Sequence, residues 1–420
     1  MLLDDDSTGA QAAASVPVVL RPSAAALRAA LARGAAYVVT NSRALSSKEA
    51  AAVTEAAAAA ILAEAPPARI VLRGDSTLRA HLVEEHDAVC RVRGWSRAPA
   101  VLVPALPAAG RVTRDGVHYL VVDGDAVPVA ETEYARDPRL GYDRSDLLEW
   151  AERRSGGRFR AADGAVVCLD VVRSRAGAAG IASAIEAVGG RAAAVAIDAE
   201  TDDDVREIAC GIHLAWSQGL RFVPRCSPAP AAALAGATAH GTVDIPAAPR
   251  LLVLCGSFVD RTTRQLARLI AEHPTALIEV DLAAASTDPS AEGRRLAEQA
   301  RTLLDDGSIA VVATPRVHVH GHAGDAAAEQ LTKALAVVAA ELAPEIDLLV
   351  LKGGATSASV VATGLAADVV DVVGPVGHGA SLWSVPVRGG ELATVVTPGN
   401  VGGDHALTDL VGRARSVATC

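Results

Sequence analysis

Residues 68–82 read ARIVLRGDSTLRAHL, and this stretch decides the fold class. It opens with a mostly apolar run that predicts a buried β-strand. The strand leads directly into Asp75, Ser76, Thr77 and Arg79, so a carboxylate, two hydroxyls and a guanidinium gather where it ends. In open α/β sheets, ligands bind at the carboxyl ends of the strands. The stretch therefore predicts an α/β sheet with a binding site at that edge.

The rest of the chain alternates predicted strands and helices, which favours α/β layers. One helix opens on the capping box Ser46-Ser47-Lys48-Glu49, and Asp202-Asp203-Asp204 is typical of another helix start. Further strands are predicted at 36–39, 100–103, 165–169, 193–197, 251–254, 278–280, 309–313, 348–351 and 369–373.

The 420 residues leave room for two domains of ordinary size. The segment from Pro228 to Pro249 is rich in proline, alanine and glycine, and we interpret it as a short helix followed by a linker. We therefore expect an N-terminal domain at 1–235, a linker at 236–249 and a C-terminal domain at 250–420. Both are expected to be layered α/β domains with mainly parallel sheets, facing an interdomain cleft.

Composition excludes several kinds of partner. The net charge of −10 argues against nucleic acid, which usually requires a basic stripe. No uncharged run of about eighteen apolar residues predicts a membrane span. The acidic start of the chain is unlike a signal peptide, so we expect a cytoplasmic protein. The six cysteines show no C-x-x-C spacing and fit buried, reduced thiols. Assembly into a homo-oligomer stays open.

Three predicted strands in the second half end in glycine turns, each followed by a predicted helix. The turns begin at Gly256-Ser257, at Gly353-Gly354 and at Gly399. Glycine lets backbone N–H groups approach an anion, and helix N-termini favour negative charge. We therefore predict that the turns converge on a phosphate-binding site, although neither G-x-x-x-x-G-K-[ST] nor a clean G-x-G-x-x-G is present. The alternative is that the glycines only close strand-to-helix turns.

Polar residues follow several predicted strands of the first half. They occur at Asp5-Asp6, at Thr40-Asn41-Ser42-Arg43, from Asp75 to Arg79, and at Arg111. Arginine binds carboxylates with two hydrogen bonds, and aspartate, asparagine and serine hydrogen-bond sugar hydroxyls. These residues predict one pocket for a small hydroxy acid. For Arg111 alone, a surface ion pair is an equally good explanation.

Eight motifs occur in order along the chain: DDSTGA, TNSR, DSTLR, PALPAAGR, ETEYARDP, GSFVDRTTRQ, GGATS and PGNVGG. With them, the chain resembles the four-carbon acid sugar kinase family over nearly its whole length. The resemblance implies an N-terminal domain that binds a sugar acid and a C-terminal domain that binds ATP. It also implies phosphorylation of an acid such as threonate, erythronate or a 3-oxo-tetronate. Kinase chemistry adds Mg²⁺ as a second cofactor.

The resemblance implies residue roles at the matching positions. Nucleotide contacts are expected from Ser257, Gly353, Gly354, Ala355, Thr356 and Gly399. Sugar-acid contacts are expected from Asp6, Asn41, Arg43, Ser76, Thr77 and Arg111.

The chain departs from the family pattern at several positions. Ala355 stands where the family usually has the acid of Gly-Gly-Asp-Thr, and Thr397-Pro398 replaces a frequent Lys-Ser. Ala80 replaces a glycine, and Val259 replaces a frequent serine. These departures motivate an alternative from another functional class, a sugar-acid or nucleotide sensor with weakened catalysis.

Asp75 and Arg79 are the predicted catalytic residues. Arg79, with Arg43, would grip the substrate carboxylate or the transferring phosphoryl group. Asp75, in preference to Asp6, would orient or deprotonate the attacking hydroxyl. An equal alternative is that Asp75 caps the turn beginning at Ser76. No protein ligand to a metal is predicted, because phosphates and water can hold Mg²⁺.

Three further alternatives stay open. His318, His320 and His322 would share one face of an extended segment, which suggests either a metal site or a solvated loop. Trp383 would either stack on adenine or lie in the core. A dinucleotide-dependent dehydrogenase is the third, and the missing G-x-G-x-x-G counts against it.

Overall fold

The computed structural model describes residues 1–6, 9–122, 124–273, 275–316, 322–399 and 401–416. The chain divides into two compact units. Unit 1 comprises Met1–Ala13 and Pro22–Thr238, and unit 2 comprises Ala14–Arg21 and Ala239–Cys420. Each unit combines strands and helices, so the predicted α/β class is confirmed.

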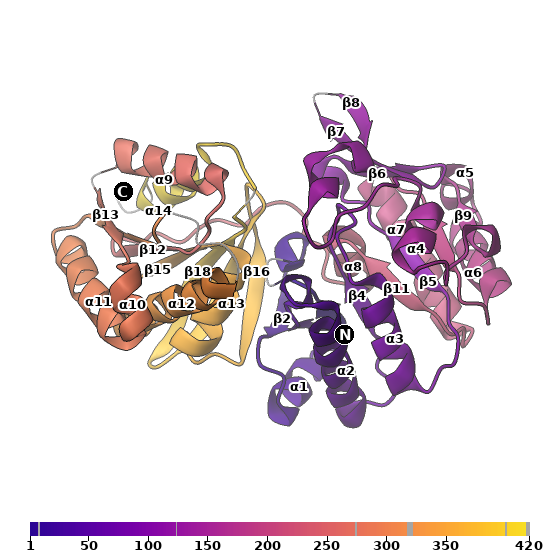
Figure 1. The fold of residues 1–420 in the computed structure, drawn as a ribbon, viewed down its shortest axis with the longest axis horizontal. Helices are drawn as coiled ribbons and strands as arrows, with labels where there is room; N and C mark the ends of the chain where they lie inside the picture. The colour runs from indigo at the N-terminus through magenta and orange to yellow at the C-terminus, as the bar shows by residue number, and fades with distance from the viewer. Residues whose placement is uncertain (7–8, 123, 274, 317–321, 400, 417–420) are drawn as a thin grey trace. The chain divides into compact units, whose positions relative to one another are not determined.

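A parallel sheet forms the centre of unit 1, with its strands in the order β3-β1-β4-β11-β5-β10-β9 (Figure 1). The strands are β1 (Leu2–Asp4), β3 (Tyr37–Val39), β4 (Val71–Arg73), β5 (Ala100–Val103), β9 (Ala165–Val167), β10 (Ala194–Ile197) and β11 (Val223–Cys226). Apart from the edge strand β9, these strands are buried along their whole length, as expected for a sheet covered on both faces.

Helices cover both faces of this sheet (Figure 1). They are α1 (Ala24–Leu31), α2 (Ser47–Glu64), α3 (Leu82–Arg93), α4 (Leu147–Arg154), α5 (Leu169–Val172), α6 (Gly177–Val188), α7 (Asp202–Ser217) and α8 (Pro228–Leu234). The predicted capping box of Ser46 and Glu49 opens α2. Thr201 and Asp204 form a second capping box at α7, so the acidic run is a helix start, as predicted.

A small antiparallel sheet follows β5 in unit 1. It consists of β6 (Arg111–Arg114), β7 (Val117–Val122) and β8 (Asp125–Pro128). The buried His118 on β7 donates from Nε2 to the carbonyl of Ser76 at 2.8 Å, because a carbonyl can only accept. This bond ties the small sheet to the loop after β4. The sequence pattern gives no indication of the sheet, since its strands are short and only partly buried.

Unit 2 has a mixed sheet in the order β13-β14-β12-β15-β18-β17-β16-β2. The first five strands are parallel, and the last four form an antiparallel block. The strands are β12 (Leu251–Cys255), β13 (Thr275–Glu279), β14 (Ile309–Ala313), β15 (Leu348–Lys352), β16 (Val369–Gly377), β17 (Ala380–Val387) and β18 (Gly390–Thr397). The strand predicted at 278–280 lies a few residues earlier, and the antiparallel block was not predicted.

Helices α9 (Asp260–Glu272) and α14 (Ala406–Ser416) cover one face of this sheet (Figure 1). Their apolar residues, including Leu266, Leu269 and Leu410, pack with alternate residues of β12, β14 and β15 in one core. On the other face lie α10 (Leu282–Thr287), α11 (Pro289–Asp305), α12 (His322–Leu342) and α13 (Gly354–Ser359) (Figure 1).

One strand of unit 2 comes from the N-terminal part of the chain. β2 (Val16–Val19) pairs antiparallel with β16, and Val19 lies opposite Val369. Beyond β2, the backbone N–H of Leu20 donates to the carbonyl of Asp368 at 2.8 Å. Arg21 forms an ion pair with the Asp368 carboxylate at 2.6 Å. The segment 14–21 therefore completes the sheet of a unit that otherwise begins at Ala239.

The cysteines and the helices bear on two expectations from the sequence, reduced thiols and the lack of a membrane span. Cys90, Cys168, Cys210, Cys226 and Cys255 are free thiols, in agreement with the prediction of reduced cysteines. The predicted burial is confirmed for Cys90, Cys226 and Cys255, but Cys168 is half-buried and Cys210 is exposed. Within the part of the chain that is described, every helix is too short or too polar to cross a membrane.

Candidate active site

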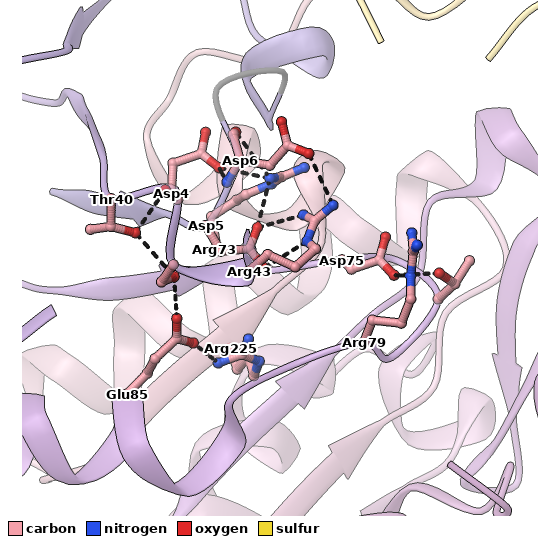
Figure 2. A network of polar contacts seen from close by, with 12 residues as sticks. Asp4, Asp5, Asp6, Thr40, Arg43, Arg73, Asp75, Arg79, Glu85 and Arg225 are labelled. Atoms are coloured by element: carbon pink, nitrogen blue, oxygen red, sulfur yellow. Dashed lines mark hydrogen bonds and ion pairs between the residues drawn. The ribbon is translucent and has the colours of Figure 1, made fainter. Parts of the chain in front are cut away.

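Polar residues of unit 1 meet at the carboxyl ends of β1, β3 and β4 (Figure 2). In the parallel register, Asp4 lies opposite both Val39 and Arg73. The segments that follow these three strands therefore leave the sheet at the same edge. This arrangement brings Asp6, Asn41, Arg43 and the loop from Asp75 to Arg79 to one side of unit 1, as predicted from the strand ends. Asn41 turns the chain with a left-handed backbone, at φ 50°.

Two arginines hold the three consecutive aspartates (Figure 2). Arg43 binds Asp5 through Nη2 at 2.5 Å and Nε at 3.1 Å, and its Nη1 reaches Asp6 at 3.1 Å. Arg73 Nη1 lies 2.7 Å from Asp4 Oδ1 and 3.1 Å from Asp5 Oδ1. Burial, against the attraction of Arg73, raises the pKa of Asp4 to about 7. Asp4 is therefore part of the buried support, whereas the side chain of Asp6 is 28% exposed.

Gly9 permits this network to form. A Cβ atom at Gly9 would lie 2.3 Å from both carboxylate oxygens of Asp4 and 2.4 Å from Cζ of Arg73. Contacts that short are not tolerated between packed atoms, so the DDSTGA motif requires glycine at this position for a packing reason.

Asp75 lies at the centre of the loop after β4. Its Oδ2 accepts from Nε of Arg79 at 2.8 Å and from the hydroxyl of Thr77. Burial tends to raise the pKa of Asp75, but the Arg43 and Arg79 cations and these two hydrogen bonds outweigh it and hold the pKa well below its usual range. Asp75 is therefore ionised, and it is suited to accept a hydrogen bond rather than to keep a proton.

The backbone of the same loop is fixed from outside. Leu78 has a left-handed backbone at φ 64°, a conformation that a branched side chain seldom adopts. The hydroxyl of Tyr142 donates to the carbonyl of Thr77 at 2.5 Å, and His118 binds the carbonyl of Ser76. Ser76 and Thr77 are themselves buried, so their side chains belong to the support of the loop.

Arg111 approaches the loop through Tyr134. The guanidinium carbons of Arg79 and Arg111 lie 5.4 and 5.9 Å from the centroid of the Tyr134 ring. Arg79 has Asp75 and, at 3.7 Å, Asp137 as acidic partners. No described residue offers Arg111 a carboxylate, and its buried Nε has no described partner. The surface ion pair considered for Arg111 is thus not formed with any residue that the structure describes.

A second buried pair lies beneath the site. Glu85 Oε2 binds Arg225 Nη1 at 2.5 Å, and the hydroxyl of Ser42 donates to the other Glu85 oxygen (Figure 2). A Cβ at Gly74 would lie 3.0 Å from Arg225 Nη2, so glycine lets β4 pass close to this pair. Tyr134, Asp137 and Arg225 were not predicted as site residues. For the first two, the only sequence signal was the ETEYARDP motif.

The glycine turns of unit 2 converge on Ser257. A Cβ at Gly353 would lie 3.3 Å from the Ser257 nitrogen, and one at Gly399 would lie 2.3 Å from Ser257 Oγ. Gly353 has φ +115°, which side-chain-bearing residues rarely adopt. A Cβ at Gly256 would lie 2.1 Å from the hydroxyl oxygen of Thr356. The three turns therefore lie together at one edge of the sheet.

The remaining predicted nucleotide residues sit at the start of α13. Gly354 opens this helix and Ala355 follows it with an exposed side chain. Thr356 is buried. Arg316, which was not predicted, donates from Nη1 to the Ser257 carbonyl at 2.5 Å and from Nε to the Thr314 carbonyl at 3.1 Å. It fixes the backbone of the first turn.

Trp383 is a core residue. It is fully buried, and its Nε1 donates to the hydroxyl of Ser381 at 2.9 Å. The adenine-stacking alternative is therefore wrong. His318 and His320 lie outside the described residues, as does the side chain of His322. Among the residues that are described, no three acidic, histidine or cysteine side chains are grouped to hold a metal ion.

Each half of the chain matches the model of a known domain family. Residues 1–234 match a sugar-binding N-terminal domain, and residues 252–407 match a nucleotide-binding C-terminal domain. The chain belongs to the four-carbon acid sugar kinase family. The resemblance seen in the sequence motifs is thereby confirmed. In this family member, the aspartate–arginine network lies within the sugar-binding match, and the glycine turns lie within the nucleotide-binding match.

Two curated relatives of this four-carbon acid sugar kinase family member are D-threonate kinases. The one from Salmonella typhimurium is 29% identical over 259 residues, covering 60% of this chain and 56% of the relative. The one from Bordetella bronchiseptica is 33% identical over 193 residues, covering 46% of this chain and 41% of the relative. The chain thus spans about half the length of the curated relatives it matches.

A solved structure supports the fold. The crystal structure of a Haemophilus influenzae protein aligns with 99% of this chain and 99% of its own, with a TM-score of 0.66 and 17% identity. At this identity, the likeness concerns the fold alone.

Proposed function

We propose that the chain is an ATP-dependent kinase that phosphorylates a four-carbon sugar acid of the threonate, erythronate or 3-oxo-tetronate type. One observation within the sugar-binding match carries the proposal. Arg79, which pairs with the ionised Asp75, and the partially buried Arg111 both lie against Tyr134, and Arg111 has no carboxylate partner among the described residues. A hydroxy acid offers a carboxylate that can bind Arg111 and a hydroxyl that can donate to Asp75. The two D-threonate kinases support the substrate class.

Arg111 is the residue proposed to bind the substrate carboxylate. All the guanidinium nitrogens of Arg43 contact Asp5 or Asp6, and Arg79 is shared between Asp75 and Asp137. Arg43 and Arg79 are therefore already paired with carboxylates, whereas Arg111 has no carboxylate partner among the described residues. Arg43 and Arg79 then act on substrate hydroxyls and on the phosphoryl group, together with the edge residues Asp6 and Asn41.

Asp75 is proposed to orient the attacking hydroxyl. Phosphoryl transfer needs little basicity, because its transition state is loose and depends on position and charge. A carboxylate whose pKa is held low remains an acceptor for the hydroxyl O–H throughout the neutral range. As the oxygen–phosphorus bond forms and the bond to ADP breaks, the hydroxyl proton passes by way of Asp75 to solvent.

The glycine turns of unit 2 fit a nucleotide. Gly353 and Gly399 leave room where a Cβ would collide with Ser257, and backbone N–H groups unobstructed by side chains suit phosphates. Ser257, Gly354, Ala355 and Thr356 complete the residues proposed to hold ATP, which supplies the phosphoryl group. Because no described cluster of acids is available for Mg²⁺, the ion is proposed to be held by phosphates and water.

The decisive test is ADP release by the purified protein with ATP, Mg²⁺ and each tetronate. Threonate, erythronate and their 3-oxo forms are screened in both configurations, with glycerate as a shorter control acid. We expect sugar-acid-dependent ADP release with at least one of them. Tight binding of a tetronate or of ATP without ADP release would support the sensor alternative instead. Absence of both binding and release would remove the proposal.

Arg111→Met should raise the KM for the sugar acid by about 10- to 100-fold, because it removes a charge-assisted hydrogen bond to the carboxylate. The effect on kcat should be small, since the carboxylate does not react. Steady-state kinetics with the best tetronate measure both. Arg114→Met, on the same strand but paired with Glu200 at the surface, is the matched control. An unchanged KM in Arg111→Met would exclude Arg111 as the carboxylate ligand.

A further inference from the structure

Lys352 is a buried cation without an acidic partner. It ends β15, directly before Gly353, and is 1% exposed. Its ammonium donates to the carbonyl of Pro398 at 2.6 Å. No described carboxylate forms an ion pair with it; of its titratable neighbours, Cys255 favours the ammonium and Arg261 disfavours it. Burying a charge in this way is costly unless something compensates it.

Three buried side chains bind backbone carbonyls of residues 398, 399 and 401–403, which follow β18. Lys352 binds the carbonyl of Pro398, and Thr262 binds that of Gly399 at 2.9 Å. Gln265 Nε2 lies 3.1 Å from the carbonyl of Val401, 3.4 Å from that of Gly402 and 2.8 Å from that of Gly403. Thr262 and Gln265 are completely buried. The carbonyls of these five residues therefore point inward, towards the buried donors.

The direction of a backbone carbonyl fixes the direction of the N–H group of the next residue. In a trans peptide the C=O of one residue and the N–H of the next point in opposite directions. The carbonyls of Pro398, Val401 and Gly402 face their buried donors, so the N–H groups of Gly399, Gly402 and Gly403 face away from the core. None of these three N–H groups donates to a described residue. A run of unpaired amides of this kind is suited to an anion.

We propose that Lys352 is a positioning residue for nucleotide binding. By holding the carbonyl of Pro398 inward, it helps to present the N–H groups of Gly399, Gly402 and Gly403 to phosphate groups, and those phosphates supply the missing negative charge. The inference rests on the proposed function in placing the nucleotide at the glycine turns. Lys352 differs from the residues predicted to contact the nucleotide, because it lies below the glycine turns and acts through the backbone that it holds.

The charge of Lys352 couples nucleotide binding to pH. In the free protein, burial lowers the pKa of Lys352 to about 8; Cys255 on β12 opposes this shift, and Arg261 on α9 adds to it. Arg316 acts on Cys255, Thr397 of β18 lies opposite Lys352, and Pro398 follows that strand. A phosphate nearby would favour the ammonium and raise this pKa. Above pH 8, the protein must therefore take up a proton to bind the nucleotide, so the affinity should fall as pH rises.

The test compares ADP and adenosine binding by calorimetry in wild type, Lys352→Met and Lys352→Arg. Lys352→Met should weaken ADP binding by at least about tenfold, because it removes a charge near the phosphates, and leave adenosine binding within about twofold. Lys352→Arg should keep most of the ADP affinity. The Tm of free Lys352→Met should not fall, since a buried uncompensated charge has been removed. Lys333→Met, at an exposed lysine paired with Glu329, is the control.

Proton uptake gives a second, independent readout. At pH 8.5, in two buffers of different ionisation enthalpy, wild type should take up protons on binding ADP and Lys352→Met should not. Equal ADP affinity in Lys352→Met and wild type would overturn the inference. So would a parallel loss of ADP and adenosine binding with a lower Tm, which indicates a structural role only. ADP binding by a wild type without kinase turnover would remove the proposed catalysis and leave this inference standing, whereas no ADP binding would remove both.

Discussion

Asp75→Asn is expected to lower kcat for sugar-acid phosphorylation by at least about 100-fold, the usual scale for a group that manages a proton in the transition state. Asparagine keeps the shape of the side chain but loses the charge that Arg43 and Arg79 now hold in the ionised form. It also presents an N–H₂ group where the substrate hydroxyl would donate. The measurement is single-turnover ADP formation at saturating tetronate and ATP.

Asp137→Asn is the matched control for Asp75. Asp137 is also an acid near Arg79, but at 3.7 Å and with a side chain 27% exposed. Its replacement should change kcat by less than about threefold, as expected for a solvent-screened pair. Full activity in Asp75→Asn would remove Asp75 from catalysis. Loss of tetronate binding together with a lower Tm would identify it as the cap of its turn.

The activity should show no acidic limb from Asp75 between pH 5 and 8. A carboxylate whose folded pKa is depressed stays ionised until the pH falls to that low value, so its function is lost only in strong acid. The corresponding stability contribution is present above the pKa of an unfolded aspartate and disappears as the pH falls towards the folded value.

Arg73→Met should destabilise the protein by about 3–5 kcal/mol, because it leaves the buried Asp4 without its cation, whereas Asp5 keeps Arg43. Arg73 is 4% exposed and Asp4 is completely buried, with Asp5 the second acid in contact. Urea unfolding followed by circular dichroism measures the loss. In Arg91→Met, which breaks the exposed pair with Glu55, the loss should stay below about 1 kcal/mol.

A double variant separates charge from packing at this position. Adding Asp4→Leu to Arg73→Met removes the uncompensated acid, so part of the lost stability should return. Equal stability of Arg73→Met and Arg91→Met would mean that Asp4 is neutral and that the buried pair contributes little. Further destabilisation by Asp4→Leu would point to shape, not charge, as the constraint.

Local sequence signals were sufficient for the strand ends of the site. Apolar runs followed by polar or glycine residues located β1, β3, β4, β12 and β15, and parallel pairing then brought their carboxyl ends to common edges. The capping boxes before α2 and α7 were also readable, since each depends on residues only three apart. These features need no knowledge of distant partners.

The partners of individual side chains could not be predicted. Nothing in the sequence around Arg73 shows that its side chain meets Asp4, 69 positions away. In the same way, the residues around Lys352 do not show that its ammonium meets the carbonyl of Pro398, 46 positions on. Tyr134 reaches Arg79 only through the irregular segment after β8. Burial and long-range pairing decide these contacts, and neither leaves a periodic signal.

The origin of β2 has a consequence for biosynthesis. Arg21 and its partner Asp368 are 347 positions apart, so the ribosome releases this edge strand long before the strand it must join exists. Until then, β2 lacks its partner β16, and a polypeptide begun at Ala239 would never acquire β2. Such a fragment would expose the backbone groups of β16 and should self-associate. Adding a synthetic peptide of residues 14–21 should reduce this self-association.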